Sequence, residues 1–233
     1  MLTPRKRIKK KDLKEDKLVT FYFKGRDWIE DNYKIIAGAL AVVVLVIAIG
    51  IVMTNRSKRA ESQASVEFAK AARVYQSNDY RNAADMFTTI VNNYGGTPSG
   101  KLSRFYLAQS LYKTEQYAEA AEHFKKFYSS FGADEHLKAT AIAGHAACIE
   151  QQGNYEQAAK KYEDALNKYP DAPQAAHYAL RAARSYEQAG NDEQARALYQ
   201  KIIKEYPDSR QKDDAVFLSA LEWNLFMQEM SWF

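Results

Sequence analysis

The longest uninterrupted apolar stretch of the chain runs from Ile35 to Met53, and its nineteen residues include no charged or amide side chain. A helix of that length covers about 28 Å, close to the roughly 30 Å hydrocarbon core of a bilayer. The alternatives are a buried core helix and a cleaved signal peptide, whose apolar region is only about 7 to 15 residues long. Because this run is longer and the polar, basic residues 54–59 follow it, we predict a retained transmembrane helix.

After the apolar run, amphipathic helical patterns alternate with short polar turns. Similar units of this kind recur along the chain. A shift of 37 residues superimposes residues 153–158 on residues 190–195, and shifts of 38 and 37 lead back to residues 115–120 and 78–83. Each unit predicts two helices joined by a turn. In the second helix a small residue and an aromatic residue stand four positions apart, on one helical face. These pairs are Ala83/Phe87, Ala120/Phe124, Ala158/Tyr162 and Ala195/Tyr199.

This pattern resembles the tetratricopeptide repeat over about residues 62–210. Pro170 and Pro207 stand at the family's terminal proline position, which Gly95 and Gly132 occupy in the first two units. The small residues of the first helices are Ala71, Ala108, Ala146 and Ala183. The resemblance implies an all-α fold, with a single N-terminal transmembrane helix followed by an α-solenoid of about four helix-turn-helix repeats and a C-terminal helix.

We therefore expect five parts along the chain. They are a basic cytoplasmic tail (1–34), the transmembrane helix (35–53), a juxtamembrane linker (54–62), the repeats (63–210) and an apolar C-terminal helix (211–233). The expected repeats cover about residues 63–99, 100–137, 138–174 and 175–210.

Positive charge is concentrated in the N-terminal tail. Residues 1–34 contain eleven Lys or Arg against six Asp or Glu, whereas the formal net charge of the whole chain is only +4. The repeats are therefore close to neutral, and we expect no specific nucleic-acid partner. Basic residues near the two ends of the apolar run are almost equal in number, four before it and five after it. The whole basic tail favours an N-terminus in the cytoplasm, with the repeats on the other side of the membrane.

The layout of a short tail, one span and then repeats resembles that of the YfgM family, whose members accompany the SecYEG translocon and contact envelope chaperones. The resemblance implies a single-pass protein of the bacterial inner membrane, anchored in the bilayer through residues 35–53, with a periplasmic repeat domain. It also implies a scaffold in a translocon or envelope-assembly complex. A structural or recruiting subunit of an unrelated membrane complex is the alternative, and self-association stays open.

No arrangement of residues predicts catalysis or a cofactor. Residues 95–101 fit the start of a phosphate-binding P-loop, but Leu102 stands where Ser or Thr must ligate Mg²⁺, and no strand pattern precedes the loop. The four histidines lack the spacing of a metal site, and the single cysteine, Cys148, excludes an intramolecular disulfide. We predict that the protein is not an enzyme and holds neither a cofactor nor a metal.

A repeat scaffold without catalytic residues acts through its surface, and two surfaces are candidates for partner binding. The first is the row of first-helix positions that line the concave side in this family; the other interpretation is that its rings pack on the neighbouring helix. Its candidate binding residues are Phe68, Tyr75, Phe105, Tyr112, Arg184 and Glu187.

The second candidate surface lies in the C-terminal helix, which has two apolar stripes. We expect one stripe, Phe217, Leu221 and Leu225, to cover the fourth repeat. The other stripe is then left for a partner, unless the chain end folds back over it. This stripe includes the candidate binding residues Trp223, Met227 and Met230.

Overall fold

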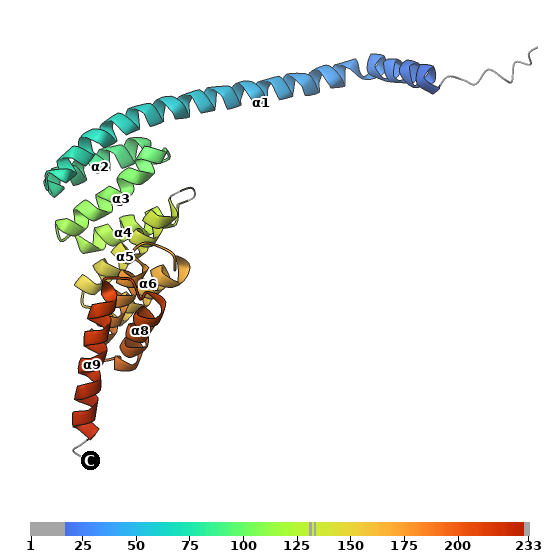
Figure 1. The fold of residues 1–233 in the computed structure, drawn as a ribbon. Helices are drawn as coiled ribbons and strands as arrows, with labels where there is room; N and C mark the ends of the chain where they lie inside the picture. The colour runs from blue at the N-terminus through green and yellow to red at the C-terminus, as the bar shows by residue number, and fades with distance from the viewer. Residues whose placement is uncertain (1–16, 131, 133, 231–233) are drawn as a thin grey trace, which may run out of the picture. The chain divides into compact units, whose positions relative to one another are not determined.

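The structure is a computed structural model that describes residues 17–130, 132 and 134–230, with side chains described only between residues 21 and 220. Within these residues the chain forms nine α-helices and no strand, which confirms the predicted fold class (Figure 1). The chain divides into two compact units at residues 56 and 57. The helices are α1 (Lys17–Gln76), α2 (Tyr80–Tyr94), α3 (Pro98–Lys113), α4 (Tyr117–Tyr128), α5 (Glu135–Gln151), α6 (Tyr155–Lys168), α7 (Ala175–Gln188), α8 (Asp192–Glu205) and α9 (Gln211–Met230).

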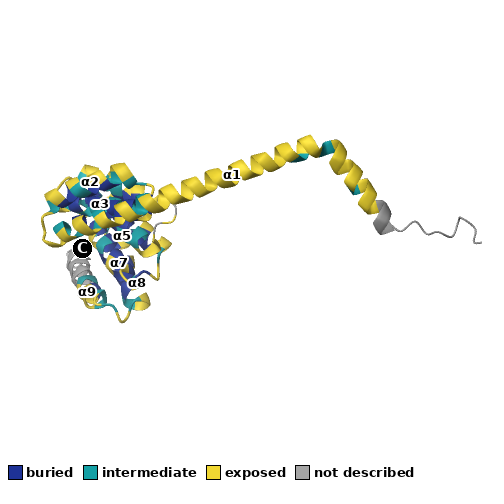
Figure 2. Ribbon diagram, turned by 90° about the horizontal axis from the view of Figure 1, so that it is seen from above, coloured by how far each residue is buried: buried dark blue, intermediate teal, exposed yellow. Residues whose placement is uncertain are grey.

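The first unit consists of the described residues up to Arg56, all of which belong to α1. The helix from Phe21 onward is long and apolar enough to cross a membrane, judged by length and composition. Its apolar side chains are exposed throughout the most hydrophobic stretch (Figure 2). Residues 54–62, expected to be a linker, continue the same helix without a break.

The second unit is an array of helix pairs. The last part of α1 pairs with α2, and α3 with α4, α5 with α6 and α7 with α8 follow, each helix packing against the next one in the chain. The alanines that the repeat pattern singled out are all fully buried, so the helices approach closely at the predicted positions. They are Ala71, Ala83, Ala108, Ala120, Ala146, Ala158, Ala183 and Ala195.

The aromatic partners of these alanines fill the space beside the helix contacts. Phe87 and Tyr199 are fully buried, and Phe124 and Tyr162 are 3% and 2% exposed. Two clusters form the core. The first, between α1 and α5, is rich in phenylalanine, and the second, between α5 and α9, consists mainly of alanine, tyrosine and leucine.

Each helix pair turns through one residue in the left-handed region of backbone space. The φ angles are +78° at Gly153 and +75° at Gly190, and 64° at both Asn78 and Glu115. These four residues are equivalent under the repeat shifts of 37 and 38 residues. The turn geometry is therefore constant along the array although only two repeats supply the glycine that favours it.

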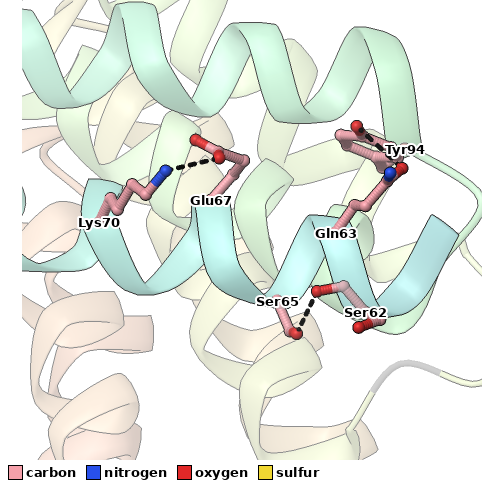
Figure 3. Close-up of polar contacts among 6 residues, drawn as sticks. All are labelled: Ser62, Gln63, Ser65, Glu67, Lys70 and Tyr94. Atoms are coloured by element: carbon pink, nitrogen blue, oxygen red, sulfur yellow. Dashed lines mark hydrogen bonds and ion pairs between the residues drawn. The ribbon is translucent and has the colours of Figure 1, made fainter. Parts of the chain in front are cut away.

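Polar contacts help to hold the last part of α1 on the first repeats. The Tyr94 hydroxyl of α2 donates to Gln63 Oε1 of α1 at 3.5 Å (Figure 3). The backbone N–H and the hydroxyl of Ser99, at the start of α3, donate to the two carboxylate oxygens of Glu61 at 3.0 and 2.7 Å. Residues from about Glu61 onward are therefore part of the repeat array.

The helix α9 packs on the fourth repeat through a different face from the one expected. Ala215 is fully buried and Leu218 packs against the second core cluster, whereas Phe217 is 64% exposed. The prediction that Phe217 belongs to the covering stripe is therefore wrong. The side chains of its other expected members, Leu221 and Leu225, lie outside the described residues.

Candidate functional site

The second unit contains an open groove of about 460 Å³ that crosses the first helices of all four repeats. The last turn of α1, together with α3, α5 and α7, supplies most of its walls, and two second helices contribute one aromatic ring each. Its lining residues are Tyr75, Gln109, Tyr112, Lys113, Phe124, Thr140, Ala143, Gly144, Ala147, Tyr162, Gln174, His177, Tyr178 and Arg181.

Side-chain hydrogen bonds between successive repeats fix the walls of the groove. The Tyr75 hydroxyl of α1 donates to Gln109 Oε1 of α3 at 2.8 Å. The hydroxyls of Thr140 on α5 and Tyr178 on α7 lie 3.2 Å apart and share a hydrogen bond. Burial raises the pKa of Tyr75 and Tyr178, so both phenols stay protonated at neutral pH. The two pairs hold neighbouring first helices in a fixed relation.

The floor of the groove is apolar and lies on α5. Ala143 and Ala147 contribute methyl groups there, Gly144 contributes backbone, and the Phe124 ring of α4 also lines the groove. A Cβ on Gly144 would lie 2.6 Å from Phe124 Cζ, so the glycine lets the ring approach the α5 backbone. The α5 part of the groove lining is therefore apolar.

One wall contains a polar cluster of Glu150, Tyr162 and Arg181. Glu150 Oε2 accepts hydrogen bonds from the Tyr162 hydroxyl at 2.9 Å and from Arg181 Nη2 at 2.6 Å. The Arg181 guanidinium also lies over the Tyr162 ring, 5.6 Å from its centre. Burial raises the pKa of Tyr162. The cluster fixes a half-buried cation at the edge of the groove, in a position set by residues from three helices.

The structure places two of the predicted binding residues, Tyr75 and Tyr112, in the groove. Phe105 is only 3% exposed, because its ring packs 5.2 Å from the Phe127 ring in the first core cluster. Phe68 is half-buried between the rings of the first two repeats and does not line the groove. Phe105 and Phe68 thus follow the other interpretation, in which the rings pack on a neighbouring helix.

In the fourth repeat the groove uses residues one turn earlier than those predicted. His177, Tyr178 and Arg181 line it, whereas Arg184 and Glu187 do not. Arg184 is exposed and its guanidinium lies 3.5 Å from the Asp214 carboxylate of α9. The groove crosses α3 near its C-terminal end and α7 near its N-terminal end, so it runs diagonally across the array. Positions that are equivalent in sequence therefore do not all face it.

The remaining predicted binding residues lie in α9, near the end of the described chain. The backbone of α9 is described as far as Met230. The side chains of Trp223, Met227 and Met230 lie outside the described residues.

The residues that could suggest catalysis are buried or take part in helix capping and hydrogen bonds within the fold. Cys148 is fully buried, and burial raises the pKa of its thiol to about 12, so the reactive thiolate does not form at neutral pH. In the P-loop-like segment, Thr97 caps α3 and Glu61 accepts the Ser99 hydrogen bonds. That segment follows the helix α2 and not a strand. Among the described residues, no group of three or more His, Cys, Asp or Glu side chains could hold a metal ion.

These features define a helical-repeat array with an open groove across the first helices of its repeats. Residues 26–216 match the tetratricopeptide repeat-like domain family, and the chain belongs to that family. This match confirms the repeat class predicted from the alanine and aromatic positions. No curated protein sequence matches the chain.

Solved structures show the same fold at low sequence identity. The TPR-like repeats of a protein from Podosopora anserina, assigned as a kinesin light chain, superimpose with a TM-score of 0.58 at 15% identity, covering 73% of this chain and 90% of that one. YrrB, described as a TPR protein with an unusual peptide-binding site, superimposes with a TM-score of 0.52 at 19% identity, covering 67% of this chain and 74% of YrrB.

Proposed function

We propose that this protein is a membrane-anchored, non-enzymatic scaffold that binds other proteins in the groove of its repeat domain. The single observation that carries the proposal is the groove itself, an open surface of about 460 Å³ with an apolar floor and hydrogen-bonded walls. Tetratricopeptide repeats form concave surfaces of this kind, and aromatic side chains within them act as anchors for extended segments or helices.

The anchor is the apolar part of α1. None of its side chains between Ile35 and Met53 is buried within the first unit, and nearly all are exposed, which favours burial in lipid. The basic tail supports an N-terminus in the cytoplasm and a repeat domain on the other side of the membrane. The resemblance of the layout to the YfgM family favours a bacterial inner membrane.

The partners that we propose are proteins of a translocon or envelope-assembly complex. The layout of tail, span and repeats supports this, because it resembles that of the YfgM family. A recruiting subunit of another membrane complex would have the same groove and anchor, so the identity of the bound protein distinguishes the two roles.

The test combines anchoring and groove binding in one experiment. A photo-crosslinking amino acid replaces Lys113, an exposed groove residue, or Lys126, an exposed lysine of α4 that does not line the groove. Cells are irradiated, and their membranes are washed with carbonate. We expect the chain to stay in the membrane and to form discrete adducts only from position 113, which mass spectrometry then identifies. Release by carbonate would refute the anchor, and identical adducts from both positions would refute the groove.

A further inference from the structure

The last helix, α9, stands where the first helix of a fifth repeat would stand. The shift of 37 residues that relates the third and fourth repeats places α7 on residues 212–225, which lie within α9. Under the same shift Ala183, the first-helix alanine of the fourth repeat, corresponds to Ala220. Like each first helix before it, α9 packs on the second helix of the preceding repeat, α8. The array therefore continues into a fifth unit.

This fifth unit does not turn into a second helix where the other units do. In the fourth repeat the turn lies at residues 189–191, and Gly190 adopts a φ of +75° there. The equivalent residues 226–228 belong to α9, which stays helical as far as Met230. Within the described part of the chain no helix follows α9, so the unit has a first helix without a second one.

The face of α9 that a second helix would cover is apolar and exposed. Val216 is 46% exposed and Phe217 is 64% exposed, and Ala220 is exposed as well. The equivalent residues of α7 are all buried, and they are Ala179, Leu180 and Ala183. The helix α7 packs against α6 and α8, whereas the described helices that pack against α9 all precede it in the chain. The difference in burial therefore marks the place of a missing helix.

The repeats of this chain define the kind of helix that fits the face. The two helices of each pair are joined by a short turn, so the second helix runs antiparallel to the first. Each second helix contributes a small residue and an aromatic residue four positions apart, and α8 supplies Ala195 and Tyr199. A helix that completes the fifth unit needs the same pattern on its apolar face.

Charge favours a helix with a basic end over a second copy of α9. The first turn of α9 contains Asp213 and Asp214, both exposed, and Asp213 stands where the fourth repeat has the buried Ala176. An antiparallel helix would place its last turn beside them, and α4, α6 and α8 each have lysine in the last turn. Residues 213–230 contain four acidic residues and no Lys or Arg, so two antiparallel copies of α9 would repel each other.

We propose that α9 binds one amphipathic helix of a partner protein, which runs antiparallel to α9 and takes the place of the second helix of a fifth repeat. Its apolar face carries a small residue and an aromatic residue four positions apart, and its last turn carries Lys or Arg beside Asp213. None of the residues that line the groove belongs to α9, so this interaction goes beyond the proposed function.

The probe is a fluorescein-labelled, amidated peptide with the sequence of residues 191–206, because α8 follows α7 as the proposed helix would follow α9. Short isolated helices are unstable in water, so a lactam bridge joins Glu193 to a lysine introduced by Ala197→Lys, two positions that are exposed in α8. The control peptide also contains Ala195→Glu on its apolar face. Fluorescence anisotropy with the full chain in a nonionic detergent should show at least about tenfold tighter binding of the first peptide.

Variants of the chain locate the binding on α9. Ala220→Glu should weaken binding at least about tenfold, because the contact would bury a carboxylate. Ala220 is exposed in the chain alone, so the urea unfolding midpoint should not change. The matched control is Gln194→Glu, which adds the same charge at an exposed position of α8 and should alter neither quantity.

A charge variant tests the basic end of the bound helix. Asp213→Asn should weaken binding about threefold, and this difference should vanish with a peptide that contains Lys204→Gln. An equal effect of Asp213→Asn on both peptides would refute the proposed pairing of Asp213 with the last turn of the bound helix.

The other outcomes overturn the inference in distinct ways. If the peptide does not bind, or binds Ala220→Glu as tightly as the unchanged chain, α9 is not its site. A lower urea midpoint of Ala220→Glu would mean that the protein itself covers this face. Sedimentation of the full chain as a dimer that Ala220→Glu dissociates would assign the face to a second copy. Crosslinking from position 113 reports on the groove separately in each case.

Discussion

A charge placed at a close helix contact tests the register of the repeats most directly. Ala158 is fully buried in α6, within the second core cluster. Ala158→Glu would insert a larger side chain into a packed contact and bury a carboxylate among alanine, tyrosine and leucine side chains. Overpacking alone costs about 1 to 3 kcal/mol, and an unpaired buried charge adds several kcal/mol unless the helices separate.

We therefore expect a loss of about 4 kcal/mol or more in the free energy of unfolding, a large share of the 5 to 15 kcal/mol typical of a domain. The assay is urea unfolding of the full chain in a nonionic detergent, followed by circular dichroism at about 222 nm. With a slope of about 1 to 3 kcal/mol per molar urea, the midpoint should fall by at least about 1 M. In a repeat array the damage is expected to be greatest near α6, because each repeat contacts only its neighbours.

Gln157→Glu is the matched control, because it adds the same carboxylate to the same helix at the adjacent, exposed position. Its effect should remain within about 0.5 kcal/mol. The reasoning would be refuted if Ala158→Glu unfolded at the same urea concentration as Gln157→Glu. Position 158 would then lie outside the helix contact, and the 37-residue alignment would be out of register.

Two further predictions concern the turns and the histidines. Gly153→Ala should destabilise the protein by about 1 kcal/mol, because φ is +78° at this position. Nothing lies within 4 Å of the added Cβ, so the cost comes from the backbone alone. The control in the same urea titration is Gly96→Ala, which is also in open space but has no positive φ. Burial lowers the pKa of His123, His145 and His177 below the usual 6.5, so the unfolded chain binds protons more readily. The free energy of unfolding should therefore fall as the pH drops below about 6.5, until the lowered pKa values are passed. In the double variant His123→Gln, His145→Gln, the urea midpoint should change less between pH 7.5 and 5 than it does in the unchanged protein.

The helix pairs could be predicted from the sequence because one local pattern of residues recurs in every pair. A small residue and an aromatic residue four positions apart define a buried face, and a repeat of 37 or 38 residues places that face in every unit. The left-handed backbone conformation of the turns is harder to predict from the sequence. Gly153 and Gly190 indicate left-handed backbone, whereas Glu115 adopts a φ of 64° although its side chain gives no such signal. The geometry of the whole repeat imposes that conformation on Glu115.

The groove could be predicted only in part, because its course depends on how successive repeats rotate against each other. The repeat alignment relates positions within the units but contains no information about that rotation. The alignment predicts Tyr112 correctly, because the groove crosses α3 at that position. On α7 the groove lies one helical turn closer to the N-terminus, so Arg181 lines it in place of the predicted Arg184. Arg181 also depends on Glu150, 31 residues earlier in another repeat, for its orientation. No sequence spacing marks a contact of this kind between repeats, so the position of Arg181 in the groove follows from the assembled array and not from any single unit.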